Sequence, residues 1–544
     1  MLPLRYRPRD ERGIALLTAV LFVLLGVIIT GSFIATSVHE TASTSNVQIA
    51  KGALYSADAG VRTMQQELAN RARRQLDSLI TVHQAAGGVG PVITAPGSFF
   101  PTTPITLTST NPVFSVSATV AWADSDIADT SQVYNYRYKI NSSGALGARG
   151  ARGVETTGIL RVSAGRGSFA DYLMFTHVHT SASGGSVWFT SNTRFDGRVH
   201  TNGQFKFAYQ PTFQDLVTSA NSKAWFYGDG RTTELAADNN PPWDVPDFFG
   251  GFTRGVAPVT LPTNTFEQQN AALGLAGTSA PSNATINGQL GFSGSSAPPA
   301  GIYLPAVGSV LTGGIYVQGN LDHCLLSVDA NGNQVYALKQ GGTTVTVTVD
   351  RLANTTTVVR GANPPEILVG TPRGSTYTTG TIAKLAGPTR LDNAPPVAGV
   401  ANGTQMLYTA AGDIVIQSDI LVTDFDHGNS VIGIYSSLGK VRIGEDAPDN
   451  LHIDAFLMAL GAQGVVTVDG YDSGAPRGDV VLRGGMVSRY YGAFGQFSDG
   501  GVSVHGYSRL FSYDRRGLIP PFYPMTPLFN ANVPSAQTLA WKEL

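Results

Sequence analysis

Histidine and aspartate side chains near residue 177 are the residues of this sequence best placed to do chemistry. His177 and His179 are separated by one residue, so on a β-strand both imidazoles would point to one face. With His200 on a nearby strand they could share a zinc ion, and Asp171 or Asp196 would supply the carboxylate that hydrolysis needs. The chain has no HExxH motif, no GxSxG motif and no P-loop, and such residues on a glycine-rich β-scaffold more often form hydrogen bonds in turns. We therefore expect no catalytic residue, no metal site and no cofactor.

Two further features bear on metal binding. Cys324 is the single cysteine, which excludes an internal disulfide and argues against a thiolate metal cluster. The segment 329–333 is similar to the start of a calcium loop, but the glutamate expected at the twelfth position is absent. A hairpin turn is the expected structure there.

Arginine is the second residue type that could do chemistry, by contacting phosphate groups. The formal net charge is −2, so the molecule as a whole does not attract nucleic acid, although net charge does not report how charge is distributed. Clustered arginines with tyrosines suit a nucleic-acid surface, and solubilising surface charge is the alternative. The candidate DNA-binding residues are Arg477, Arg483, Arg489, Tyr490, Tyr491, Arg509, Arg515 and Arg516.

An uncharged stretch from residue 14 to residue 35 is the most distinctive element that positions these side chains. As a helix, its 22 residues would cross the roughly 30 Å hydrocarbon core of a bilayer. The preceding basic segment, LRYRPRDERG, predicts that the N-terminus stays in the cytoplasm and that the rest of the chain lies outside. The predicted anchor residues are Ile14, Leu17, Leu21, Leu24, Ile28 and Ile34.

Three interpretations of this stretch remain open. A cleaved secretory signal would have an apolar core of about 7–15 residues and small residues before the cut, where this chain has Phe33. A plain single-span anchor fits the length. In a type IV prepilin, a short basic leader would end at Gly13, and one helix, first apolar and then amphipathic, would begin at Ile14. The third interpretation accounts best for both flanks of the stretch.

The pattern after the apolar stretch predicts one long helix and a sheet that covers it. Apolar residues from Leu54 to Leu79 recur at three- and four-residue steps, and Gly87-Gly88 would end the helix. Alternating segments at 113–122, 133–140 and 157–163 predict antiparallel strands, and 538–544 predicts a terminal strand that returns to them.

From about residue 171 the pattern changes to short strands between glycine and turn residues. Such repetition predicts a β-solenoid, with a propeller or a sandwich as the alternative. The segment 228–300 is expected to form long loops, and 343–359 a β-hairpin. The short strands are expected at 185–192, 197–202, 313–320, 412–419, 439–444 and 478–484.

The N-terminal motifs resemble those of a known family. ERGIALLTAVLFVLL together with ADAGVR at 57–62 resembles the N-terminal region of PilX-type minor pilins of type IV pili. The resemblance implies that a prepilin peptidase cuts after Gly13 and that Ile14 is methylated. Thr18 stands where most major pilins carry glutamate, which puts ordinary packing in the middle of a filament in doubt.

A second resemblance covers roughly residues 170–525. Segments 171–180, 195–207, 434–459, 492–500 and 506–524 are similar to the large competence-associated minor pilins of the ComZ type. This implies a β-solenoid inserted in a pilin head, a place at the pilus tip and capture of extracellular DNA in natural transformation. It also implies other pilins and the pilus assembly machinery as partners, with a single-pass inner-membrane location in a bacterium before assembly and a cell-surface pilus afterwards.

The expected fold class is therefore α+β, mostly β, with a long pilin helix packed on an antiparallel sheet and a large inserted β-solenoid. The expected function is that of a non-enzymatic minor pilin that recognises DNA. The alternatives are a pilus-borne or membrane-anchored adhesin and a polysaccharide-acting surface enzyme, whose groove would need paired carboxylates. The expected segments are a leader at 1–13, the helix at 14–86 with its transmembrane part at 14–35, the head sheet at 87–170, the solenoid at 171–525 and the returning strand at 526–544.

Overall fold

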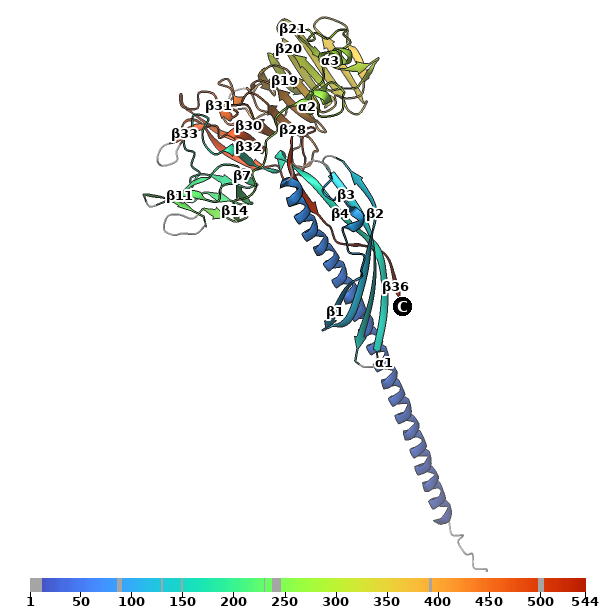
Figure 1. Cartoon of the computed structure of the whole chain (residues 1–544). Coiled ribbons are helices and arrows are strands. Elements are labelled where there is room, and N and C mark those ends of the chain that lie inside the picture. Colours follow the sequence, from blue (N-terminus) through green and yellow to red (C-terminus); the bar gives the residue numbers. More distant parts are fainter. Residues whose placement is uncertain are drawn as a thin grey trace, which may run out of the picture. The chain divides into compact units, whose positions relative to one another are not determined.

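The computed structural model divides the chain into two compact units, and strands dominate it after one long helix (Figure 1). Unit 1 holds the chain up to Arg166 together with Phe529–Leu544, and unit 2 holds Gly167–Leu528. The predicted class, α+β and mostly β, is confirmed. The structure describes residues 12–85, 91–128, 131–147, 150–228, 230–236, 246–390, 394–497 and 503–544, without the side chains of 12–14, 84, 85 and 527–530.

Helix α1 (Arg12–Ala85) is 74 residues long and contains no proline, so nothing interrupts its hydrogen bonds. At 1.5 Å per residue it measures about 110 Å. The apolar side chains of its first half are exposed, whereas Met64, Leu68 and Leu76 in its second half are fully buried. The leader up to residue 11 and the glycines predicted to end the helix lie outside the described residues.

The second half of α1 is buried by one antiparallel sheet of unit 1 (Figure 1). Alternate residues of the sheet, such as Phe114, Tyr134 and Tyr138, are buried in the same core as the helix face. The last strand lies antiparallel to β4, with Trp541 opposite Thr156. The strands are β1 (Ile105–Thr110), β2 (Val113–Ile127), β3 (Ser131–Leu146), β4 (Gly150–Ser168), β35 (Met525–Asn532) and β36 (Gln537–Glu543), after the short helix η1 (Pro96–Ser98).

Unit 2 is built around two ladders of parallel strands, and successive strands alternate between them. Aliphatic side chains such as Ile414, Val441 and Val466 pair from one strand of a ladder to the next and are buried. One ladder contains β24 (Ser375–Thr378), β26 (Gln405–Ala410), β28 (Val431–Ser436), β30 (Leu451–Ala459) and β32 (Pro476–Tyr490). The other contains β25 (Ile382–Ala386), β27 (Ile414–Ile416), β29 (Val441–Ile443) and β31 (Val466–Val468).

The first ladder continues beyond β32 into strands that carry two of the predicted histidines, His177 on β5 and His200 on β7. These are β5 (Met174–Val178), β7 (Val199–Thr201), β10 (Val217–Ser219) and β14 (Phe252–Arg254), preceded by the short helix η2 (Phe169–Asp171). β34 (Ser503–Tyr513) pairs β32 and β33 (Gly495–Phe497). Two small sheets complete this region, one of β8 (Lys206–Ala208), β11 (Ala224–Gly228) and β12 (Arg231–Leu235), and one of β6 (Arg194–Phe195), β9 (Thr212–Phe213) and β13 (Asp247–Phe248).

The hairpin predicted at 343–359 is confirmed, because β21 (Thr343–Asp350) pairs antiparallel with β22 (Thr355–Arg360). The turn at 329–333 is held by Asp329, whose Oδ1 accepts the backbone N–H groups of Asn331 and Asn333 at 2.8 and 2.9 Å. The neighbouring strands are β15 (Gly301–Tyr303), β16 (Ala306–Val307), β17 (Val310–Leu311), β18 (Ile315–Gln318), β19 (His323–Val328), β20 (Gln334–Gln340) and β23 (Glu366–Val369).

Two predictions for unit 2 were wrong. Residues 185–192 form no strand, because their pairing is limited to two isolated bridges, Ser186 with Thr180 and Phe189 with Phe207. The segment 228–300, expected as loops, contains helices α2 (Phe266–Ala272) and α3 (Asn283–Leu290).

A short internal repeat explains the two helices. Asn270 and Asn287 begin matching segments, NAALGLAGTSAP and NGQLGFSGSSAP. Each buried amide donates two hydrogen bonds, Asn270 to the carbonyls of Gly277 and Ser279 and Asn287 to those of Gly294 and Ser296, all at 2.8–2.9 Å. These hydrogen bonds join each helix to the loop that follows it.

Candidate functional site

The predicted anchor residues lie on the free half of α1. Leu17, Leu21 and Leu24 are 69%, 60% and 59% exposed, and Ile28 and Ile34 are similarly uncovered. α1 is the only described helix that is long and apolar enough to cross a membrane. Gly13 and Ile14 lie in its first turn, where side chains are not described.

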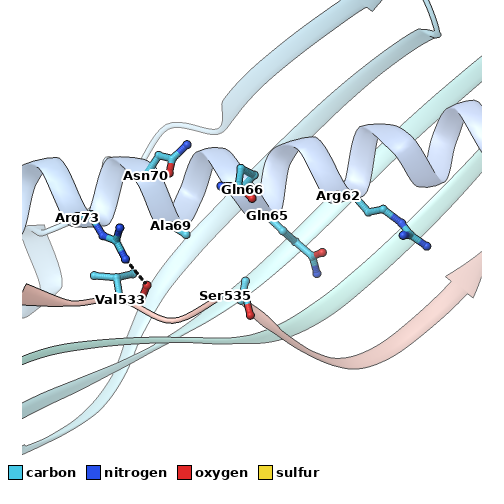
Figure 2. A pocket seen from close by; sticks show the side chains of 9 residues that line it. Arg62, Gln65, Gln66, Ala69, Asn70, Arg73, Val533 and Ser535 are labelled. Carbon is cyan, nitrogen blue, oxygen red and sulfur yellow. Dashed lines mark hydrogen bonds between the residues drawn. The ribbon is translucent and has the colours of Figure 1, made fainter. Parts of the chain in front are cut away.

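A shallow groove of about 360 Å³ runs between α1 and the segment that connects β35 to β36. Figure 2 shows Gln65 and Arg73 of the helix facing Val533 and Ser535 of this segment. Gln65 donates hydrogen bonds of 2.9 Å to the hydroxyls of Tyr138 and Thr538, and Arg73 donates a longer one to the carbonyl of Val533. These hydrogen bonds therefore hold the C-terminal segment against helix α1.

Two of the three predicted histidines, His177 and His200, form a hydrogen-bond network around Asn202. The amide nitrogen of Asn202 donates to His177 Nδ1 at 3.0 Å and to the carbonyl of Val259 at 2.7 Å. Its oxygen accepts the backbone N–H of Val259 at 2.7 Å and lies 2.9 Å from His200 Nε2. His200 Nε2 must therefore carry a proton, and its Nδ1 must accept from the Thr218 hydroxyl at 2.7 Å. Burial lowers the pKa of His200 to about 4, which keeps the ring neutral.

His179 lies apart from this network. β5 ends at Val178, so the strand alternation that would align His179 with His177 stops one residue too early. The His179 ring is buried between Phe189 and Phe205, with centroid distances of 4.7 and 4.9 Å. Burial, with a smaller contribution from Lys206, lowers its pKa to about 3.

The carboxylates considered for a zinc site are engaged elsewhere. Asp171 caps helix η2 through a hydrogen bond from the backbone of Ser168, and Asp196 accepts the backbone N–H of Tyr513 at 2.7 Å. In the part of the chain that the structure describes, no three His, Cys, Asp or Glu side chains are grouped so that they could hold a metal ion.

Three of the candidate DNA-binding arginines form ion pairs with aspartates of unit 2. Arg483 makes a bidentate pair with Asp454, at 2.6 and 2.7 Å, and the Asp454 carboxylate is buried. The other two pairs are Arg516–Asp514 at 2.7 Å and Arg477–Asp449 at 3.2 Å. Their charges are largely neutralised within the chain.

Among the residues with described side chains, the remaining candidate DNA-binding arginines contact backbone carbonyls or an aromatic ring and not an aspartate carboxylate. Arg489 donates to the carbonyls of Leu460 and Gly461, and Arg515 donates to the carbonyl of Asp196. Tyr491 is buried and Tyr490 half-buried. Arg509 lies 5.5 Å from the centre of the Tyr491 ring, and no carboxylate among the described residues contacts it.

A cleft of about 410 Å³ on the second ladder was not predicted from the sequence. At its centre Arg442 is held by Asp413 at 3.1 Å and Asp469 at 2.7 Å. Burial opposes the charge of Arg442, but these two aspartates outweigh it and raise the pKa of the arginine. Glu445 and Asp446 add two carboxylates to the lining, so the cleft carries a net negative charge and disfavours polyanions. Thr381 and Gln417 supply neutral hydrogen-bonding groups.

Comparison with known proteins gives three findings. Residues 133–222 match the family model described as a domain of unknown function, DUF4900. The chain is similar to the crystal structure of the competence-associated pilin ComZ from Thermus thermophilus, with 12% sequence identity and a TM-score of 0.32, over 91% of this chain and 98% of that one. No curated protein matches. The segment matched by the family model includes His177, His200 and Asn202.

Proposed function

We propose that this chain is a minor pilin of a type IV pilus, held in the bacterial inner membrane by α1 before assembly and exposed on a cell-surface pilus afterwards. The observation that supports this most directly is the continuity of α1, whose first half is apolar and exposed and whose second half is the core of unit 1. A run of exposed leucines and isoleucines of this length needs a bilayer or neighbouring helices around it. A plain anchor would not need to continue as the central helix of the outer fold.

We place the subunit at the pilus tip, with other pilins and the assembly machinery as partners. Unit 2 is much larger than unit 1 and is inserted between two strands of the unit 1 sheet. A subunit with such an insertion is difficult to repeat along a tightly packed filament. In this proposal unit 2 is a β-solenoid that presents a non-catalytic binding surface.

The ligand that we propose is extracellular DNA, taken up in natural transformation. Arg509 supports it, because this cation has no carboxylate partner among the described residues. The acidic cleft around Arg442 favours a second candidate, adhesion to a neutral or cationic polysaccharide. Carboxylates and amides in a cleft suit a ligand rich in hydroxyl or amino groups and disfavour phosphates.

The mature N-terminus tests the pilin assignment. Purified protein should begin with N-methylated Ile14, and a Gly13→Leu variant should keep its leader, as shown by intact-mass analysis. Gly26→Leu, a glycine with open space around it in the same helix, is the matched control and should be processed normally. A mature chain that begins beyond residue 35 would exclude the assignment. Normal transformation by a deletion strain would exclude the DNA role and leave adhesion.

A further inference from the structure

Within the described ranges, one arginine of unit 2, Arg509, lacks the carboxylate partner that other arginines of this unit have. Arg509 projects from β34, and its half-buried guanidinium has a ring contact with Tyr491 but no hydrogen-bond acceptor among the described residues. Arg477, Arg483 and Arg516, by contrast, each have an aspartate. A partly buried charge without a partner is costly, unless a ligand supplies the opposite charge.

A second arginine lies beside this cation. Arg194 of β6 lines one small pocket together with Arg509, and β6 lies next to β34. Arg194 is exposed and has no ion-pair partner in the described part of the chain. Phe195 and Phe511 form the buried wall of the pocket, and Asn192 and Thr193 complete it.

The nearest acid in the sequence does not neutralise this pocket. One carboxylate oxygen of Asp196 accepts the backbone N–H of Tyr513, and its main-chain carbonyl accepts a hydrogen bond from Arg515. Arg515 is itself exposed and adds a third positive charge near the same short strand. The local charge is therefore positive, although the chain as a whole carries −2.

From this arrangement we infer that Arg194 and Arg509 form an oxyanion site that binds a phosphate of the polynucleotide backbone. The planar guanidinium offers paired N–H donors that match two oxygens of a phosphate. The aspartate-paired arginines contribute much less, because their donors are already used. This inference rests on the proposed DNA recognition for the identity of its ligand, but not for the anion chemistry.

The test measures binding of a fluorescent single-stranded oligonucleotide by the detergent-solubilised full chain over a salt series. Arg194→Gln with Arg509→Gln should weaken binding at least tenfold and reduce the slope of log K against log salt by roughly 0.7, the contribution of one phosphate contact on a single strand. Arg231→Gln removes an exposed arginine of β12, in another sheet of unit 2, and should change binding less than twofold. If the Arg194→Gln, Arg509→Gln double variant and the Arg231→Gln variant weakened oligonucleotide binding equally, the inference would be overturned.

A second measurement separates failure of the site from failure of the DNA proposal. Inorganic phosphate, compared with chloride at equal ionic strength, should raise the unfolding temperature of the wild type but not that of Arg194→Gln, an exposed change that the fold should tolerate. Phosphate stabilisation without oligonucleotide binding would refute DNA recognition and retain the oxyanion site. Absence of both effects in the wild type would refute the site as well.

Discussion

The guanidinium carbon of Arg483 lies 3.9 Å from the centre of the Phe425 ring. Arg516 approaches the same ring to 4.0 Å, and each arginine is fixed by its own buried aspartate, Asp454 or Asp514. Arg483 lies on β32 and Arg516 follows β34, so Phe425 links two ion pairs from different parts of unit 2.

Phe425→Ala should therefore destabilise unit 2. Two cation–π contacts are worth about 0.5–2 kcal/mol each, so we expect a loss of about 1–4 kcal/mol in the free energy of unfolding, measured in urea. Phe249→Ala, at a ring that is 69% exposed, should cost less than about 0.5 kcal/mol. Equal losses for the two variants would show that the arginine contacts contribute nothing.

The buried histidines should make unit 2 sensitive to acid. Burial lowers the pKa of His179 to about 3 and of His200 to about 4, from an ordinary value of 6.5. Between about pH 6.5 and pH 4 the unfolded chain binds protons at these positions and the folded chain does not, so stability is lost as the pH falls through this range. At pH 5 each histidine should cost about 2 kcal/mol.

His179→Phe should remove its share of this loss. The drop in unfolding free energy between pH 7.5 and pH 5 should be smaller by about 2 kcal/mol in the variant, because phenylalanine does not titrate. Phe249→Ala, which removes an exposed side chain that does not titrate, should leave the drop unchanged. An unchanged drop in His179→Phe would mean that the ring is protonated in the folded chain.

Gly144 permits close contact between β3 and α1 in unit 1. A Cβ at this position would overlap the backbone of Ala53 and Ala57. Gly144→Ala should therefore cost about 1–3 kcal/mol by forcing the helix and strand apart, as measured by thermal unfolding. Gly97→Ala, where a Cβ would meet open space, is the matched control, and a loss as large as that of Gly144→Ala would contradict the contact.

The free half of α1 should tolerate charge poorly. Leu24→Lys places an ammonium group near the middle of the apolar stretch, at a cost of about 3 kcal/mol for insertion. The variant should move from the membrane fraction to the soluble or aggregated fraction after carbonate extraction. Gln48→Lys, at an exposed position beyond the apolar stretch, should stay in the membrane. Full retention of Leu24→Lys would argue against a membrane-embedded helix.

The long helix and the strands near residues 113–163 could be predicted because their periodicity continues for many residues. α2 and α3 could not, since helices of 7 and 8 residues have too few turns to show an apolar face. Their signal was the repeated NxxLG segment 17 residues apart, a pattern that a search by secondary-structure periodicity overlooks.

The ion pairs could also have been found by spacing. Asp413 precedes Arg442 by 29 residues, Asp454 precedes Arg483 by 29 and Asp449 precedes Arg477 by 28. That distance is about one turn of the parallel ladders, so the partners lie on neighbouring strands. Without the length of a turn, the arginines could only be grouped by proximity in the sequence. The separation of His179 from His177 and His200 was harder to predict from the sequence, because it depends on the end of β5 at Val178.

Strands β4 and β35, through which the chain enters and leaves unit 2, are adjacent in the sheet of unit 1. The two ends of the inserted unit therefore lie close together, and the entropy cost of bringing such ends together rises only slowly with the length of the insertion. In the proposed pilin, α1 and the sheet of unit 1 can therefore stay unchanged while unit 2 is replaced by a shorter or longer insertion that presents another binding surface.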